Sequence, residues 1–420
     1  MPLLPNRTTG RNRRPVRADI EGLRGWLAAV IVLSRLSGVP EEGAPGVDGF
    51  FVISGFLITG LLVWELRSTG RVSIAAFFAR RARRILPTAA AVLAVTVAAT
   101  SVMWSAPRAL RAGLDSLSAL TLVENWHLIA SRRSHLQPNT DASPVEHFWS
   151  LAVEGQFYVT WPLVIIGAAL LVTRLGRLAR LGPLLLITAA AAFIASGLYS
   201  THATRLDPSA ASVDTFARAW EFVPGIVAAL VTHRVTSTPR WIRCVGLWLG
   251  IASTAAAFAL VDPNLGFSGS RTLLVIVGTA FIVGFGTNTE GTATGILACA
   301  PARFVGRRAY PLYLWHFPAA VLIMEALGRT WWAACITLGA TVLLSEASYH
   351  WIERRALRSS WLRGWEVPAG HLRRDRARRR LRERAGVSAI LVVIAGSAVA
   401  QLAAPTRFAD PSYVISELGR

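Results

Sequence analysis

Ionisable side chains inside long apolar runs are the first candidates for chemistry in this sequence. Arg24 and Arg35 lie eleven residues apart in a run that otherwise reads as a membrane span. Eleven residues make almost three helical turns, so both guanidinium groups share one face, about 16 Å apart along the axis. Arg35 would lie near the middle of the hydrocarbon, where a charge is costly enough to indicate a functional site. Asp48 opens the next apolar run, residues 46–60.

Two later segments combine ionisable and aromatic side chains at helical spacing. In residues 147–162, Glu154 shares a helical face with Tyr158, and with Phe157 and Trp161. In residues 309–318, one face carries Tyr310, Tyr313 and His316. A buried glutamate and a neutral imidazole can transfer protons near pH 7. The alternative is that these residues only join helices by hydrogen bonds, as we also consider for Ser54, Glu221 and Glu346.

A basic stretch precedes the third apolar run. Within FFARRARRILP (77–87), i,i+3 and i,i+4 spacings relate four arginines: Arg80, Arg81, Arg83 and Arg84. One face of such a helix presents two or more guanidinium forks, which suit a phosphorylated ligand such as a nucleotide diphosphate or coenzyme A. The alternative is the ordinary excess of arginine at the cytoplasmic ends of spans.

The composition predicts a membrane protein. The chain is 53% hydrophobic and 16% charged, with a mean hydropathy of +0.45, whereas soluble proteins carry about a quarter charged residues. Its repeated apolar runs predict an all-α polytopic transmembrane bundle. The net charge of +20, carried by arginine alone, fits the positive-inside rule and contact with anionic lipids better than nucleic-acid binding, since no stacking platform accompanies it. The three cysteines show no metal-ligand or disulfide spacing.

The basic clusters predict a topology. With the N-terminal residues 1–18 in the cytoplasm of a plasma-membrane protein, ten spans keep the basic loops inside: 25–39, 47–66, 88–106, 148–172, 182–200, 216–232, 243–261, 271–288, 309–327 and 330–348. Residues 107–146 are then expected to contain a peripheral or re-entrant helix in an outer loop. A basic cytoplasmic linker (356–386), an eleventh span (387–404) and a short outer tail (405–420) would follow.

Seven segments, in this order, are similar to the integral membrane acyltransferase-3 family. They are DIEGLRG (19–25), GVDGFFVISGFLITGLL (46–62), FFARRARRILP (77–87), HFWSLAVEGQFYVTWP (147–162), RAWEFVPGIVAAL (218–230), GRRAYPLYLWHFP (306–318) and SYHWIERR (348–355). The combination of GFFVISGFLITG with FWSLAVE-x-QFY is specific, and the segments cover residues 19–355 as one membrane domain. The chain is therefore identified as a member of this family.

The resemblance implies an activity and a set of site residues. Members transfer an acyl group, often acetyl, from acyl-coenzyme A on the cytoplasmic side to a hydroxyl of an envelope glycan, glycolipid or similar acceptor. Acyl-coenzyme A would be a co-substrate, with no tightly bound cofactor and no metal. The expected phosphate-binding residues are Arg81 and Arg84, with Arg80 and Arg83 beside them. The expected catalytic residues are Arg24, Arg35, Asp48, Glu154 and His316, and the expected lining residues are Ser54, Tyr158, Tyr310 and Tyr313.

Two positions depart from the family pattern. The family carries an essential histidine where this sequence has Arg35, and a guanidinium has no acceptor and cannot be a general base. The family's second acidic residue after Glu154 is replaced by Gly155. We therefore expect Arg35 to bind an acyl carbonyl or an anion, while Glu154 or His316 takes the hydroxyl proton.

Three functions are compatible with these residues. The first is an active O-acyltransferase, and the second is an inactive relative that binds acyl-coenzyme A or lipid in envelope assembly. The third is a transporter whose intramembrane arginine recognises an anionic solute. Many members also carry an outer serine-esterase-like domain, and no Gly-Asp-Ser motif occurs in residues 405–420. Either the chain is truncated or a separate extracytoplasmic partner supplies that domain.

Overall fold

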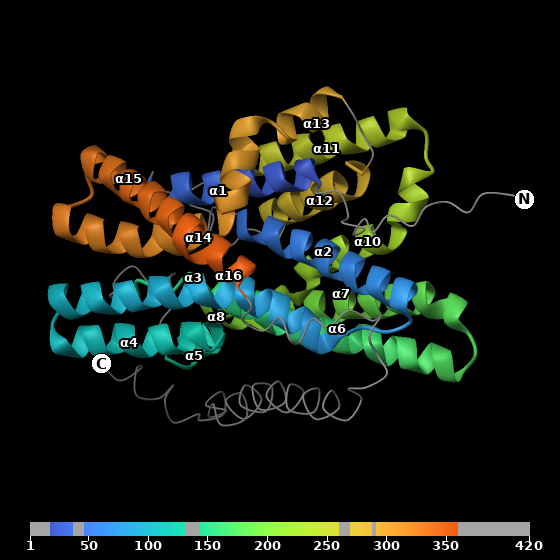
Figure 1. Cartoon of the computed structure of the whole chain (residues 1–420), viewed down its shortest axis with the longest axis horizontal. Helices are drawn as coiled ribbons and strands as arrows, with labels where there is room; N and C mark the ends of the chain where they lie inside the picture. Colours follow the sequence, from blue (N-terminus) through green and yellow to red (C-terminus); the bar gives the residue numbers. More distant parts are fainter. Residues whose placement is uncertain (1–16, 37–45, 132–142, 260–268, 288–290, 360–420) are drawn as a thin grey trace, which may run out of the picture.

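The computed structural model describes residues 17–36, 46–131, 143–259, 269–287 and 291–359. Within these ranges the chain is a bundle of helices without strands, as predicted (Figure 1). The α-helices are α1 (Ala18–Leu36), α2 (Gly46–Thr69), α3 (Ile74–Met103), α4 (Ala106–Leu120), α5 (Glu124–Ala130), α6 (Phe148–Arg174), α7 (Leu181–Leu206), α8 (Pro208–Val213), α9 (Thr215–Arg218), α10 (Val223–Thr236), α11 (Arg240–Ala259), α12 (Gly269–Phe285), α13 (Thr292–Leu297), α14 (Ala300–Leu327), α15 (Trp331–Ser348) and α16 (Arg354–Arg358). Short 3₁₀ helices span Leu178–Arg180 and Ala219–Phe222, and a π-helix spans Tyr349–Glu353.

Each of the ten expected spans overlaps a helix in the structure. Among the described residues, five helices are long and apolar enough to cross a membrane by length and composition: α2, α3, α6, α7 and α11. The chain is thus a multi-pass helical membrane protein, and the count of ten spans stays a prediction. The eleventh span (387–404), the outer tail and nearly all of the basic linker lie outside the described residues.

Helix α3 is longer than the sequence suggested. Residues 77–87 were expected as a cytoplasmic stretch before the third span (88–106), but α3 runs without interruption from Ile74 to Met103 and contains Pro87. Its start is capped by Ser73, whose side chain accepts a hydrogen bond from the Ala76 backbone N–H. The basic stretch is therefore the first part of a long membrane helix, so its arginines can reach the interior of the bundle.

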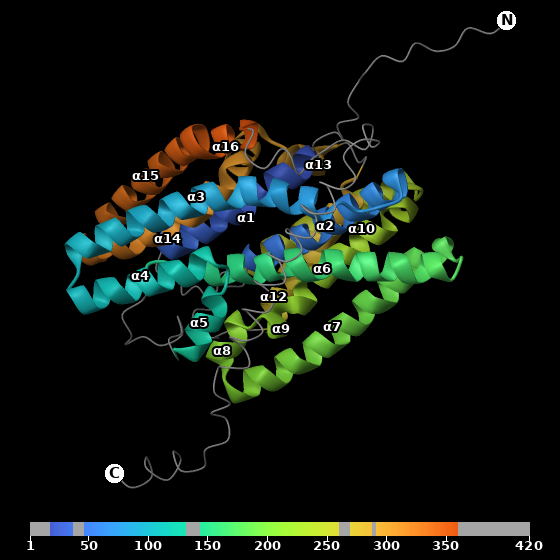
Figure 2. The ribbon, with the colours of Figure 1, turned by 60° about the horizontal axis from the view of Figure 1, so that its bottom comes forward.

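The region from 107 to 146 contains helices that stay beside the bundle. Helix α4 returns alongside α3, and α5 lies against α6 (Figures 1 and 2). The Gln156 side chain of α6 donates to the Leu122 carbonyl oxygen (3.1 Å) and to Asn125 Oδ1 (3.0 Å). Asn125 in turn donates to Thr215 Oγ1 at the start of α9 (2.9 Å). This polar network fixes the peripheral helices to α6.

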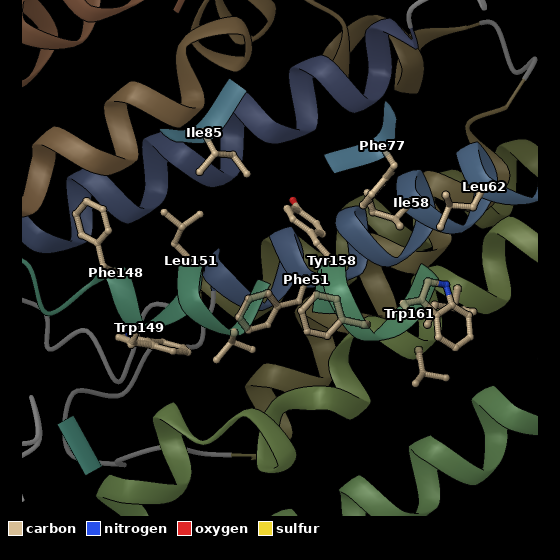
Figure 3. Packing of buried hydrophobic residues seen from close by; sticks show 14 of the residues in the cluster. Phe51, Ile58, Leu62, Phe77, Ile85, Phe148, Trp149, Leu151, Tyr158 and Trp161 are labelled. Carbon is tan, nitrogen blue, oxygen red and sulfur yellow. The ribbon is translucent and has the colours of Figure 1, made fainter. Parts of the chain in front are cut away.

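The largest apolar core packs α2, α3 and α6 together. Its aromatic members include Phe51, Phe77, Phe148, Tyr158 and Trp161 (Figure 3). The Trp161 indole N–H donates to Thr59 Oγ1 at 2.7 Å, which ties α6 to α2. Helix α6 therefore has a fixed rotation, and the residues one to two turns before Trp161 face α2 and α3.

Glycines bring helix backbones into direct contact, including those of α1 and α14 and those of α2 and α10. A Cβ atom built on Gly25 of α1 would lie 2.0 Å from the Ala302 carbonyl oxygen of α14, and one on Gly306 would lie 1.8 Å from the Glu21 oxygen. A Cβ on Gly225 of α10 would lie 1.9 Å from the Val52 oxygen of α2. Small residues allow such close approach of membrane helices. These contacts position α1 and α2, whose polar residues were the first candidates for chemistry.

Replacing Gly306 with alanine should destabilise the bundle, because the added methyl group meets a backbone oxygen that cannot move without shifting α1. Overpacking of this kind costs about 1–3 kcal/mol. The thermal midpoint of the purified protein in detergent, followed by intrinsic fluorescence, should fall. The matched control is Gly339→Ala in α15, where a Cβ would meet no heavy atom within 4 Å. Equal midpoints for the two variants would contradict the tight α1–α14 contact.

Candidate functional site

A pocket lies between α1, α2, α3, α6 and α14. Its empty volume is about 810 Å³, including space open to solvent. Four of its lining residues, Phe51, Ile85, Leu151 and Tyr158, appear in Figure 3. The polar and charged lining residues are Arg24, Ser54, Arg81, Arg84, Ser150, Glu154, Tyr158, Tyr310 and Tyr313. Most of the expected site residues are therefore brought together in one place, from helices far apart in the sequence.

Glu154 is the carboxylate of this pocket. Its Oε1 atom accepts hydrogen bonds from the Ser54 hydroxyl of α2 and from the Tyr158 hydroxyl one turn along α6. Ser54 and Tyr158 are both buried, at 8% and 7% exposure. The i,i+4 spacing of Glu154 and Tyr158, read from the sequence as one helical face, thus corresponds to a direct hydrogen bond.

Three arginines face the same pocket. Arg24 comes from α1, and Arg81 and Arg84 come from one face of α3 at i,i+3 spacing. The Arg81 guanidinium lies 5.0 Å from the centre of the Tyr158 ring. With Glu154 as the only carboxylate of the lining, the wall carries three positive charges and one negative, a formal excess of two. This excess favours a ligand with several negative charges.

The other two arginines of the basic stretch do not line this pocket. Arg80 lies 3.5 Å from the Glu65 carboxylate of α2, and the buried Arg83 donates from Nε to the Ala79 carbonyl oxygen at 3.4 Å. The helical period of α3 therefore divides the four arginines, so that Arg81 and Arg84 alone among them face the pocket.

A buried acid near the arginines was missed from the sequence. Glu353 ends the π-helix that follows α15, and its Oε2 atom has no hydrogen-bond partner within the described ranges. Burial raises the pKa of the Glu353 carboxyl, against the opposing effect of the nearby Arg84 and Arg24. π-Helical turns occur often at functional sites. The available signal was the acidic residue in the motif SYHWIERR (348–355).

Arg35 and His316 lie in a neighbouring cluster that shares Tyr313 with the pocket. The Arg35 guanidinium lies 4.2 Å from the centre of the Phe317 ring, and His316 Nδ1 lies 2.5 Å from the Tyr313 carbonyl oxygen. His147, which was not singled out from the sequence, stacks on Phe317 with ring centres 4.9 Å apart. Neither Arg35 nor His316 lines the pocket that contains Glu154.

Tyr313 forms the boundary between the cluster and the pocket. Its hydroxyl lies 2.6 Å from Ser150 Oγ, and it donates to the His147 carbonyl oxygen at 2.8 Å. The ring centre of His147 lies 5.3 Å from that of His316, and both nitrogens of the His147 ring lack a hydrogen-bond partner among the residues placed by the structure. In the sequence, the feature that could have indicated a role for His147 is its position directly before the motif FWSL.

Asp48 lies in a third group, which is ionic and fully enclosed. Its Oδ1 atom is 2.5 Å from Arg218 Nη2, and Arg218 Nη1 is 2.9 Å from Glu221 Oε1. The three residues are 2%, 4% and 0% exposed, and none lines the pocket. Two carboxylates and one guanidinium thus join α2 to the segment before α10. This arrangement agrees with the alternative considered for Glu221, in which its side chain only joins neighbouring helices.

Glu346 also lies away from the pocket. Its Oε1 atom accepts from Arg308 Nη2 at 2.8 Å, and His350 Nε2 lies 2.8 Å from the same oxygen. The Glu346 side chain is 37% exposed. Among the described residues, no group of three or more His, Cys, Asp or Glu side chains is arranged to hold a metal ion.

These observations define a polytopic helical membrane protein with a pocket that combines arginines and a hydroxyl-bonded carboxylate. Comparison with known families then places it: the acyltransferase domain family matches residues 17–350, and the chain belongs to that family. The resemblance found in the sequence is thereby confirmed.

Three relatives illustrate the comparison. The chain is 28% identical over 347 residues to the putative peptidoglycan O-acetyltransferase YrhL of Bacillus subtilis, covering 80% of this chain and 54% of the relative. It is 29% identical over 362 residues to the peptidoglycan O-acetyltransferase OatA of Listeria monocytogenes, covering 83% and 56%. A putative O-acetyltransferase of Staphylococcus aureus is 27% identical over 364 residues, covering 83% and 59%. The chain thus spans little more than half the length of these relatives. No solved structure matches it.

Proposed function

We propose that this protein is a membrane-embedded O-acyltransferase that moves an acyl group, with acetyl as the first candidate, to a hydroxyl of a cell-envelope glycan. The donor would be acyl-coenzyme A. One observation carries the proposal: Glu154, bonded to two hydroxyl groups, shares a pocket with the three arginines Arg24, Arg81 and Arg84. The names of the relatives support acetyl transfer to a peptidoglycan hydroxyl.

The residues of the pocket divide the chemistry between them. The arginines of α3 would bind the phosphates of coenzyme A by charge-assisted, forked hydrogen bonds. The thioester would then lie near Glu154, which can take the proton of an attacking hydroxyl. Arg24 completes the positive lining and can stabilise charge that develops on the thioester oxygen.

The mechanism has a general base even though Arg35 cannot act as one. The carboxylate of Glu154 lies in the pocket, whereas Arg35 lies on the Phe317 ring outside the lining. We therefore propose that Arg35 and His316 do not take part in proton transfer and only set the shape and charge of the neighbouring cluster. In this proposal the protein lies in the plasma membrane with its N-terminus in the cytoplasm. The donor enters from the cytoplasm and the acceptor from outside. Anionic lipids and a separate esterase-like protein are the proposed partners. The arginine-rich ends of the expected spans support the orientation.

A second candidate is an inactive relative that binds acyl-coenzyme A or lipid. This candidate rests on the expectation that Arg35 replaces the family's histidine, and the Arg35 guanidinium lies 4.2 Å from the Phe317 ring centre. A guanidinium at this position cannot accept a proton. Both candidates predict that the protein binds coenzyme A, but only the active acyltransferase is expected to turn over.

The test is release of coenzyme A from acetyl-coenzyme A by the purified protein in detergent, with digested peptidoglycan fragments as acceptor. Wild type should turn over. The Arg81→Ala, Arg84→Ala double variant should weaken coenzyme A binding by about 10²–10⁴-fold, since hydrogen bonds to charged groups contribute about 1.5–3 kcal/mol each. Arg80→Ala, whose side chain faces Glu65, should change binding less than about twofold, because it makes no contact with the pocket.

Two outcomes would reject the proposal in different ways. Turnover by Arg35→His together with an inert wild type would establish the inactive relative. Unchanged coenzyme A binding in the Arg81→Ala, Arg84→Ala variant would remove the donor site from this pocket and favour the transporter hypothesis.

A further inference from the structure

We infer that Ser54 is the nucleophile of a two-step transfer and carries the acyl group between donor and acceptor. This inference rests on the proposed function. Ser54 lines the pocket from α2, and its hydroxyl donates a hydrogen bond to Glu154 Oε1. A serine hydroxyl bonded to a carboxylate at a cavity wall is the arrangement of an activated nucleophile and its base.

The base is itself held by a third group. The Tyr158 hydroxyl donates to the same Glu154 oxygen, and the Arg81 guanidinium lies over the Tyr158 ring at 5.0 Å. The carboxylate is thus oriented by α6 and directed toward α2. Nucleophile, base and orienting group come from two helices that the Trp161–Thr59 hydrogen bond holds in register.

The backbone under Ser54 is also fixed. The next residue, Gly55, packs so closely on α10 that a Cβ there would lie 2.2 Å from the Phe222 carbonyl oxygen. Ser54 therefore stands on a segment of α2 that cannot rotate without separating α2 from α10. A nucleophile on such a rigid element can be held at attacking distance from a bound thioester.

The other hydroxyls of the lining have different partners. Ser150 Oγ pairs with Tyr313 Oη at 2.6 Å, and the Tyr310 hydroxyl donates to the Ile85 carbonyl oxygen at 2.8 Å. Ser54 and Tyr158 alone among the lining hydroxyls bond to the carboxylate. Of these two, the aliphatic alcohol is the stronger nucleophile once its proton is removed, which assigns the acyl carrier to Ser54.

Both steps balance with Ser54, Glu154 and the two substrates. In the first, Ser54 Oγ attacks the thioester carbonyl as Glu154 takes its proton. The new C–O bond forms, the C–S bond breaks, and the departing thiolate leaves as coenzyme A with that proton. In the second, Glu154 takes the proton of the acceptor hydroxyl, whose oxygen attacks the ester on Ser54. The Ser54 oxygen leaves and regains the proton, so enzyme and base return to their starting state.

The experiment uses the full chain in detergent with isotope-labelled acetyl-coenzyme A and no acceptor, followed by acid quench and peptide mass spectrometry. We expect a burst of coenzyme A release that approaches one per chain, and one labelled acetyl group on the peptide that contains Ser54. Digested peptidoglycan fragments added before the quench should discharge the label. Ser54→Ala should abolish both burst and label.

Two further variants separate chemistry from folding. Ser54→Cys should accept the acyl group as a thioester, which hydroxylamine cleaves at neutral pH more readily than an ester. Ser116→Ala removes another buried serine, whose hydroxyl donates to the Ala112 carbonyl oxygen of its own helix. This variant should label as wild type does, because Ser116 does not line the pocket.

The outcomes distinguish this inference from the function on which it rests. Coenzyme A release that requires acceptor, with no labelled protein, would establish direct transfer and overturn the role of Ser54 while leaving the acyltransferase intact. A label on Tyr158 or on another residue would also overturn it. Absence of coenzyme A release under all conditions would overturn the proposed function itself.

Discussion

Replacement of Glu154 by glutamine is expected to lower kcat for coenzyme A release by about 10²–10⁴-fold, the usual contribution of a general base. Glutamine keeps the size of the side chain and can still accept hydrogen bonds from Ser54 and Tyr158, but it cannot take a proton at neutral pH. The KM for acetyl-coenzyme A should change only a few-fold, since the arginines proposed to bind its phosphates remain. Steady-state kinetics in detergent would measure both quantities.

The matched control is Glu325→Gln. Glu325 is a carboxylate of similar type that forms an ion pair with Arg108 outside the pocket. We expect its kcat to stay within about twofold of wild type, as for an exposed ion pair. If Glu154→Gln retained near-normal kcat, the base would have to be sought elsewhere, and the cluster of His147 and His316 would be the next place to test.

Removal of Arg218 is expected to have the largest effect on stability. Arg218→Met would leave the carboxylates of Asp48 and Glu221 buried without their cation, and breaking a buried ion pair in this way costs about 3–5 kcal/mol. The variant should unfold at a much lower temperature or denaturant concentration in detergent, or fail to accumulate. Midpoints from intrinsic fluorescence would give the difference.

The charge-neutral triple variant tests the reason for that loss. Arg218→Met combined with Asp48→Asn and Glu221→Gln removes all three charges together. It should recover a large part of the lost stability, because replacing a complete buried ionic group is far less costly than removing one partner. A single Arg218→Met variant as stable as wild type would show that this group does not hold α2 to the segment before α10.

The sequence predicted the helices and most of the pocket, because both follow from hydrophobic period and from family motifs. Glu154 with Tyr158, and Arg81 with Arg84, share faces at helical spacing, and each pair does lie in one pocket. Helical spacing shows which residues of one helix share a face. It does not show which face meets which neighbouring helix.

That difference explains the residues placed elsewhere. Arg35 and His316 satisfy the same spacing arguments as Glu154, yet they lie beyond Tyr313 in the neighbouring cluster. Asp48 has an ion-pair partner, Arg218, that lies 170 residues further along the chain. No local pattern predicts such a pairing, because it depends on how α2 and the segment before α10 pack. The start of α3 was missed for a related reason. Clustered arginines indicate where the chain meets the membrane surface, but a helix can continue through that surface.

The backbone contacts at the glycines also constrain which substrates can fit. Helices α1 and α14, and helices α2 and α10, touch through carbonyl oxygens and cannot separate without losing those contacts. Under the proposed function, room for a longer acyl chain would therefore come from smaller lining side chains, such as those at Ile85 of α3 and Leu151 of α6. With the proposed acetyl-coenzyme A as the natural donor, smaller residues at these two positions should admit donors with longer acyl chains.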